Sequence, residues 1–184
     1  MQIFRPYIDW EKSAAFLDDL RLGKQRVEAK QVIRIVLRRL GLIDDGSRGW
    51  WNHPIVLMYF NNGEPYLEDL VNYFNATVRE WTKRNRRNFL TLDDLIPFIE
   101  RVRGISGTPV THVHELEYRR VLLMKNPCYY LKKLSPKELE EILETEPVTI
   151  SGVNTWLFKR YEIYKELVAM LRRGEVPCNL RFQR

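Results

Sequence analysis

The sequence predicts an all-α fold, a compact single-domain helical bundle with a C-terminal helical extension. Apolar residues recur at spacings of three and four along several segments, which is the period of an amphipathic helix. No segment shows the sustained apolar–polar alternation of a half-buried strand. Short stretches rich in Gly, Asn, Asp and Pro separate the periodic segments, as turns do. At 184 residues with 45% hydrophobic content, the chain has the size and composition of one well-packed domain.

The most strongly patterned segment covers residues 20–40. Its apolar face is formed by Ala29, Val32, Ile33, Val36, Leu37 and Leu40, and a cationic stripe follows from Arg26, Lys30, Arg34 and Arg38. We expect Arg21–Arg26 to precede the regular helix, with Gly23 letting the backbone approach an anion and the helix N-terminus adding partial positive charge. The stripe is either a solvated face or an anion-binding surface.

The remaining elements follow from periodicity and from capping residues. Asp9 or Ser13 caps a first helix that runs to Leu20, and Asn52 or His53 caps another that contains Pro54 in its first turn. Capping-box patterns begin helices at Thr91 and Ser135. Further helices are expected over about 54–60, 65–84, 95–102, 112–125, 136–146 and 154–173, with turns at 43–49, 61–63 and 104–109.

The charge balance points to a polyanionic partner. The formal net charge is +6 and the isoelectric point is about 9.4, which favours nucleic acid. No apolar run is long enough to span a membrane, and the first residues lack the order of a signal peptide. Two cysteines are too few for a disulfide framework, so we expect a reducing cytoplasm, although a single Cys128–Cys178 bridge stays open.

Familiar catalytic motifs are missing from the sequence. It contains no P-loop, dinucleotide-binding fingerprint, HExxH motif or paired CxxC motif. The nearest metal-binding pattern is His112-x-His114-Glu115, but helical residues two apart point about 200° away from each other. We therefore expect no metal and no cofactor, and assign these residues to capping and packing.

Aromatic residues lie beside cations in two segments. His53 follows Trp50 and Trp51, which is typical either of base stacking with a phosphate contact or of a core tryptophan pair with a capping histidine. Tyr129 and Tyr130 stand near Lys125, Lys132 and Lys133, which suits stacking on distorted nucleic acid or ordinary core packing.

The order of these features is more specific than any one of them. LGKQRVEAKQV is followed by GWWNHP, by a long helix with a basic end, and by a late segment with a histidine, basic residues, KNP and a tyrosine pair. In this order the chain resembles the pyrimidine-dimer DNA glycosylases of the phage endonuclease V type, and especially their cellular relatives. The resemblance covers residues 1–133, a glycosylase-like helical core, and leaves residues 134–184 as an extension.

The resemblance implies a small all-α enzyme that kinks duplex DNA, flips a base and excises it without a metal. In such enzymes the N-terminal amine attacks C1′ of the damaged nucleotide and forms a Schiff base, and β-elimination then cuts the strand at the abasic site. An α-amine titrates near pH 8, so a useful fraction is unprotonated at neutral pH. A glutamate supports the sugar cation and the proton transfers, and arginines bind the phosphates.

By position, Arg26 and His53 match residues of the family, and Arg119, Arg120, Lys125, Tyr129 and Tyr130 fall in its late basic–aromatic segment. Together with the residue patterns described above, the resemblance gives two sets of expected site residues. The catalytic set is the Met1 amine, Glu28 and His53; the DNA-binding set is Arg21, Lys24, Arg26, Lys30, Trp50, Trp51, Arg119, Arg120, Lys125, Tyr129 and Tyr130. The sequence departs from the family pattern at two positions that affect the catalytic set. The chain reads Leu22-Gly23-Lys24 where the phage motif has its glutamate, so Glu28, Asp18 or Asp19 must replace that acid. Gln2 is too large for removal of the initiator methionine, so the amine belongs to Met1.

Three functions are therefore compared. The first is a monomeric DNA-repair glycosylase with associated abasic-site lyase activity, acting on double-stranded DNA that carries damaged or abasic nucleotides. The second is a non-catalytic nucleic-acid-binding protein on the same scaffold. The third is a metal-dependent nuclease that uses His112, His114 or Glu115. Borohydride-trapped adducts that need a free α-amine would distinguish the first from the other two.

Overall fold

In a computed structural model, which describes residues 1–178, all regular structure is helical, as the sequence predicts. The helices are α1 (Trp10–Phe16), α2 (Asp19–Arg39), α3 (Pro54–Phe60), η1 (Asn61–Gly63), α4 (Leu67–Lys83), α5 (Ile96–Ile99), α6 (His112–Lys125), α7 (Pro127–Tyr130), α8 (Pro136–Glu144), α9 (Thr155–Phe158) and α10 (Tyr161–Arg172). None of them has the combination of length and hydropathy that a membrane span needs.

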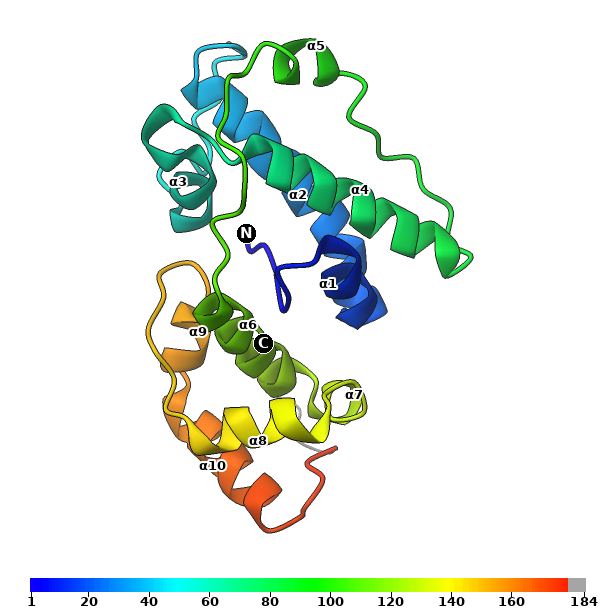
Figure 1. Cartoon of the computed structure of the whole chain (residues 1–184), viewed down its shortest axis with the longest axis vertical. Helices are drawn as coiled ribbons and strands as arrows, with labels where there is room; N and C mark the ends of the chain where they lie inside the picture. The colour runs from blue at the N-terminus through cyan, green and yellow to red at the C-terminus, as the bar shows by residue number, and fades with distance from the viewer. Residues whose placement is uncertain (179–184) are drawn as a thin grey trace.

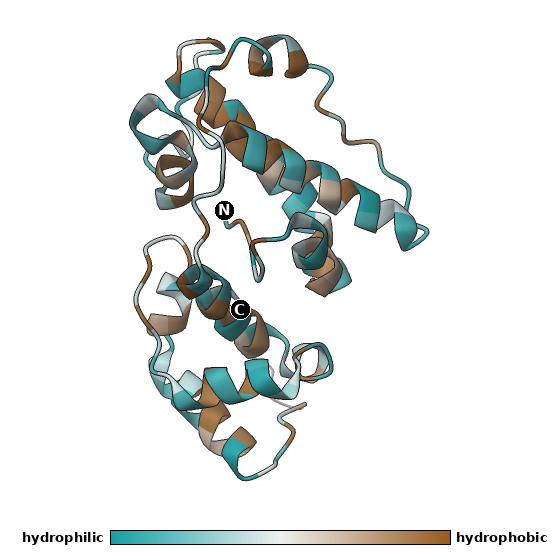
Figure 2. Cartoon of the chain, viewed as in Figure 1, coloured by the Kyte–Doolittle hydropathy of each residue, from teal (hydrophilic) through white to brown (hydrophobic). Residues whose placement is uncertain are grey.

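The helices form two halves with the N-terminal segment between them (Figure 1). In one half α2 packs on α4, and its core includes Ile33, Tyr59 and Leu70. In the other half α6 to α10 surround a second core, which also takes in side chains from α1. Trp10 packs against both cores and so links them. Figure 2 shows hydrophobic and hydrophilic residues alternating along α4, which is how an amphipathic helix covers a core, whereas residues 117–124 of α6 are all buried.

The first helix ends earlier than predicted. Asp9 caps α1, whose last residue is Phe16, and Leu17 is already extended. Asp18 then begins a new helix because its side chain accepts a hydrogen bond from the backbone N–H of Arg21 at 2.9 Å. Leu20 therefore belongs to α2 and not to the first helix.

Gly23 also lies within α2, so the prediction that Arg21–Arg26 precedes the regular helix is wrong. A Cβ at this position would lie 3.3 Å from the indole ring of Trp81. The glycine thus permits close packing between α2 and α4 and does not admit an anion.

Two other segments differ from prediction. The helix predicted over 95–102 is reduced to α5, because the carboxylate of Asp94 pairs with Lys30 and Arg34 and does not cap a helix. The helix predicted over 154–173 is divided into α9 and α10 around Lys159 and Arg160. The capping box at Ser135 and Glu138 is confirmed.

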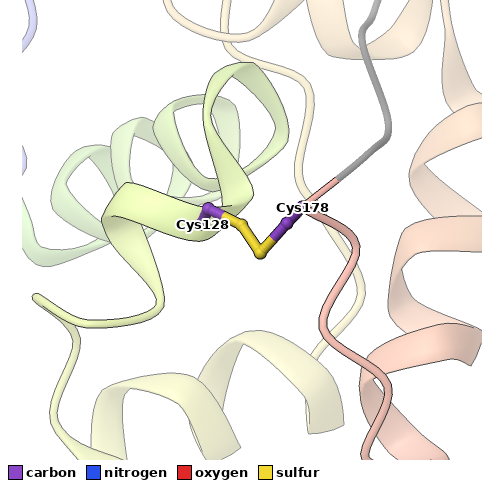
Figure 3. Close-up of a disulfide and its surroundings, with 2 residues drawn as sticks. All are labelled: Cys128 and Cys178. Carbon is purple, nitrogen blue, oxygen red and sulfur yellow. A yellow bond between two sulfur atoms is a disulfide. The ribbon is translucent and has the colours of Figure 1, made fainter.

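Cys128 and Cys178 form a disulfide, which the sequence had left open (Figure 3). Their Cα atoms are 5.0 Å apart, and the bridge joins α7 to residues 50 positions later. Because such bonds persist in oxidising environments, the two cysteines no longer support the expectation of a reducing compartment.

A cationic pocket at the N-terminus

Met1 lines an open pocket of about 480 Å³ to which both halves of the fold contribute residues. Its lining residues are Met1, Gln2, Phe4, Leu20, Arg21, Lys24, Glu28, Lys125, Trp156 and Arg160. Five of these were expected from the sequence: Met1, Arg21, Lys24, Glu28 and Lys125. Residues from the N-terminal segment, α2, the end of α6 and α9 thus meet at one place.

Gln25 holds the N-terminal segment against α2. The Phe4 backbone N–H donates to its Oε1 at 2.7 Å, and its Nε2 donates to the Gln2 carbonyl at 2.9 Å. The side-chain amide thereby pairs with residues 2 and 4 as a neighbouring strand would. Its Nε2 also donates to Glu28 Oε2 at 3.0 Å, so one fully buried side chain orients both the N-terminal segment and the pocket carboxylate.

A buried ion pair fixes the same segment on α4. Arg5 is fully buried, and its guanidinium contacts Asp69 Oδ2 at 2.6 Å. Trp10 Nε1 donates to the other oxygen of Asp69 at 2.7 Å, and Arg5 also donates to the Ile8 carbonyl. With the charges paired and hydrogen-bonded, the direction of residues 1–9 is set by the core.

The extension also contacts the N-terminal segment. Gln2 Nε2 donates to the Val153 carbonyl at 2.6 Å. Gly152 has a φ of 80° and lies close to Pro54. A Cβ added to Gly152 would be 3.0 Å from the Pro54 side chain. The loop before α9 is therefore packed between the first residues of the chain and the start of α3.

Glu28 is the carboxylate that the pocket presents. Burial raises its pKa, and the positive charges of the Met1 α-amine and Lys24 oppose that shift. Asp18 and Asp19, the other acids considered, are both committed to cations: Asp18 pairs with Arg21 at 2.7 Å, and Asp19 with Arg84 at 2.9 Å. Of the three acids proposed as replacements, only Glu28 lines the pocket.

The cations of the pocket outnumber its one carboxylate. Burial, together with the charges of Arg21, Arg160 and Lys24, lowers the pKa of Lys125 to about 8. Its Nζ lies 3.8 Å from the ring centroid of Trp156, and Arg160 Cζ lies 4.8 Å from the same centroid. Such a site attracts an anion, and it holds Lys125 close to the point of losing its proton at neutral pH.

His53 lies next to the pocket but does not line it. It caps α3, where Nδ1 accepts a hydrogen bond from the Ile55 N–H at 3.2 Å. Burial and the positive charge of the α-amine lower its pKa, which keeps the ring neutral. Trp50 packs edge-on against His53 and is 56% exposed, while Trp51 faces Arg39 and Arg48. The tryptophans thus lie outside both the core and the pocket.

Arg119 and Arg120 were assigned to DNA, and the structure corrects this. Both are buried, at 3% and 0% exposure. Arg120 donates to the Ile142 and Thr145 carbonyls and pairs with Glu117 at 3.2 Å, while Arg119 donates to the Pro6 carbonyl. Their guanidinium groups are used inside the protein and cannot reach a phosphate.

Tyr130 belongs to the core, and Tyr129 packs against it. Tyr130 is fully buried, and its hydroxyl accepts a hydrogen bond from the Asp18 N–H at 3.1 Å. Tyr129 is half-buried and donates to the Leu17 carbonyl at 3.2 Å. For Tyr130, which is fully buried, core packing is the interpretation that the structure bears out, and its assignment to DNA binding is corrected. Tyr129 packs against the same core with part of its side chain exposed.

Arg26 and Lys30 face away from the pocket. Arg26 lies over the Trp81 ring, 4.0 Å from its centroid, and donates to Asn88. Lys30 pairs with Asp94 at 2.5 Å and donates to the Thr91 carbonyl. Both side chains brace residues 88–94 against α2, so the first part of the stripe has a structural role.

The histidines of α6 are engaged separately. His112 bridges Glu115 and Glu141, at 3.2 and 2.9 Å, and His114 accepts a hydrogen bond from the Thr111 N–H. Among residues 1–178, no group of three or more His, Cys, Asp or Glu side chains is placed to hold a metal ion.

Sequence reasoning missed four residues that shape the site: Gln2, Gln25, Trp156 and Arg160. Gln25 had a signal, because it falls four residues before Ala29 on the buried face of α2, where a polar side chain needs a partner. Trp156 and Arg160 had none, because they reach the pocket only through the packing of the extension.

Comparison with known proteins gives one result. A family model described as pyrimidine dimer DNA glycosylase matches residues 1–94. No curated protein and no solved structure matches the chain. The matched part contains Met1, Arg21, Lys24 and Glu28, and it ends before the segments that supply Lys125, Trp156 and Arg160. Because the match spans more than half of the 184 residues, the chain belongs to the pyrimidine dimer DNA glycosylase family.

Proposed function

We propose that the protein is a DNA-repair glycosylase with associated abasic-site lyase activity, acting through a Schiff base of its N-terminal amine. Its substrate is double-stranded DNA that carries damaged or abasic nucleotides. The observation that carries the proposal is the shared pocket of the Met1 α-amine and Glu28, in a chain of this family.

The chemistry needs an amine, a carboxylate and cations. The amine attacks C1′, the bond from C1′ to the base breaks, and the base leaves with a proton. The sugar ring then opens to an imine, which is the Schiff base. A base removes a proton from C2′, the C3′–O bond breaks, and water finally hydrolyses the imine to release the enzyme.

Glu28 is assigned both proton transfer and stabilisation of the sugar cation. Burial raises its pKa, which favours proton exchange, and its side chain lines the same pocket as the α-amine. Arg21, Lys24 and Lys125 are assigned to the phosphates of the bound strand. His53, which is neutral and close to the α-amine, is assigned to orienting that amine.

The test is borohydride trapping on a duplex that contains one abasic site. We expect a covalent adduct that maps to Met1 by mass spectrometry, and strand cleavage that continues in excess chelator. Glu28→Gln should lower the rate of cleavage by about 10²- to 10⁴-fold. Extending the chain by two residues before Met1 should move the amine out of the pocket and abolish the adduct.

Two results would reject the proposal. Salt-dependent binding without any adduct or product would identify a non-catalytic DNA-binding protein. Cleavage that stops in chelator would identify a metal-dependent nuclease.

A further inference from the structure

Three residues of the pocket, Lys125, Trp156 and Arg160, come from the part of the chain beyond the family match, and the last two lie in the C-terminal extension. Trp156 lies in α9, and Arg160 stands between α9 and α10. Trp156 contacts two cations, since Lys125 Nζ and Arg160 Cζ lie 3.8 and 4.8 Å from its ring centroid. These contacts fix the positions of two long side chains that would otherwise be flexible.

The start of α9 is held in place by a buried polar network. Asn154 is fully buried; its Nδ2 donates to Glu117 Oε2 at 2.6 Å and to the Val148 carbonyl at 2.7 Å. Its Oδ1 accepts from the Ile150 N–H at 2.8 Å. Trp156 therefore follows a residue anchored to α6, the same helix that ends at Lys125.

Two positive charges of the pocket, those of Lys125 and Arg160, lack a carboxylate partner among the residues that the structure describes. Neither Lys125 nor Arg160 forms an ion pair with a carboxylate in the described part of the chain. Arg160 is half-buried, and its guanidinium lies over the Trp156 ring, with Cζ 4.8 Å from the ring centroid. A guanidinium stacked in this way keeps its N–H groups for an oxyanion, and its fork matches phosphate geometry.

We propose that Arg160, braced by Trp156 and adjacent to Lys125, binds a backbone phosphate of the DNA strand that enters the pocket. The extension is thereby part of the substrate-binding surface, and residues 155–160 complete a site that the matched residues only begin. This inference rests on the proposed function for its ligand, a DNA phosphodiester. Arg160 is a binding residue and does not take part in the bond-breaking steps.

The test compares Arg160→Gln with Lys159→Gln. Lys159 is the neighbouring cation; it is exposed and does not line the pocket, so both variants remove one charge from the same segment. Binding is measured by fluorescence anisotropy on a duplex with a non-cleavable tetrahydrofuran abasic analogue, at several salt concentrations. We expect Arg160→Gln to weaken binding about tenfold and to reduce the slope of log K against log salt by about 1. Lys159→Gln should change affinity less than twofold.

Variants of the tryptophan test the bracing. Trp156→Phe keeps an aromatic face and should retain most of the affinity, whereas Trp156→Leu should resemble Arg160→Gln. Arg160→Lys should recover the salt slope without the full affinity, because an ammonium cannot replace the guanidinium fork. Far-UV circular dichroism checks that each variant is folded. If Arg160→Gln does not fold, Arg160→Lys still tests the proposal, which predicts weaker binding with the wild-type salt slope.

Equal affinities and slopes for Arg160→Gln and Lys159→Gln would overturn the proposal. The binding measurement needs no chemistry, so it separates this proposal from the proposed function. A wild-type protein that forms no borohydride adduct but loses affinity through Arg160→Gln would overturn the glycosylase mechanism and support the phosphate contact. A wild-type protein that forms the adduct while Arg160→Gln and Lys159→Gln bind DNA equally well would support the glycosylase mechanism and overturn the phosphate contact.

Discussion

At the scale of single residues, Gln25 has the largest effect on the site without touching its chemistry. Its amide satisfies the Phe4 N–H, the Gln2 carbonyl and one oxygen of Glu28, and it also accepts from the Tyr73 hydroxyl at 3.1 Å. A hydrophobic residue of the same size would leave these groups without their partner in a place that water does not reach.

Gln25→Leu should therefore lower the free energy of unfolding by about 2–4 kcal/mol, because more than one buried polar group loses its hydrogen bond. The rate of adduct formation should fall with it, since both the amine and Glu28 lose their orientation. Urea denaturation and borohydride trapping measure the two effects. Gln31→Leu on the exposed side of α2 is the control, and an equal loss of stability in that variant would contradict the role given to Gln25.

Lys125 gives the site a dependence on pH. Its pKa of about 8 means that it is mostly charged at pH 7 and mostly neutral at pH 9. The positive charge of Lys125, which would bind a phosphate, is lost as pH rises through this value. Affinity for DNA should therefore fall between pH 7 and pH 9 by roughly three- to tenfold. Lys125→Arg keeps its charge across the range. Anisotropy titrations at pH 7 and pH 9 should show a smaller fall for Lys125→Arg, and parallel falls would remove Lys125 from the phosphate contacts.

At the scale of elements, α2 organises the molecule by presenting different residues on different faces. One face is apolar and packs in the core, a second carries Arg21, Lys24 and Glu28 to the pocket, and a third carries Arg26 and Lys30 to residues 88–94. The helix can serve three partners because residues one position apart point about 100° from each other.

Packing of α2 on α4 depends on the missing side chain of Gly23. Gly23→Val should destabilise the protein by about 1–3 kcal/mol, because the added atoms would overlap Trp81, which is itself held by a hydrogen bond to the Arg87 carbonyl. In a Trp81→Ala background the same substitution should cost much less. Chemical denaturation of the wild type, the two single variants and the double variant gives the coupling energy between positions 23 and 81. Additive effects would show that the contact with Trp81 is not the reason for glycine at position 23.

The helices themselves were largely predictable, and the exception at 95–102 is assigned to a long-range contact. The apolar periods of α2, α4 and α6 and the caps at Asp9, His53 and Ser135 are local properties of the sequence. Thr91 and Asp94 were expected to form a capping box, but the carboxylate of Asp94 pairs with Lys30 and Arg34 over a long range. Local patterns cannot anticipate a partner sixty residues away.

At the scale of the whole molecule, the pocket exists because two halves meet around the N-terminal segment (Figure 1). The first half supplies the α-amine and Glu28, and the second supplies Lys125, Trp156 and Arg160. The Cys128–Cys178 bond closes the second half by joining α7 to the end of the described chain (Figure 3).

Reduction of this disulfide should lower the stability of the oxidised protein by about 4 kcal/mol, the chain-entropy value for a loop of 50 residues. Urea denaturation with and without a reductant measures the difference. A Cys128→Ser/Cys178→Ser variant should match the reduced protein and respond to no reductant. An oxidised protein whose midpoint is unaffected by reductant would show that the bond contributes nothing to folding.

The sequence by itself determined that the chain is helical, that it is basic, and which family it resembles, because periodicity, charge and motif order are carried by residues near one another. It also named Met1, Arg21, Lys24, Glu28 and Lys125 as candidate site residues, and all five line the pocket. Only the tertiary structure decided that Arg119, Arg120 and Tyr130 are buried and that Trp156 and Arg160 line the pocket. The sequence does not distinguish an arginine or lysine that binds a backbone carbonyl from one that binds a phosphate. Its partner is determined only when helices distant in the sequence pack together.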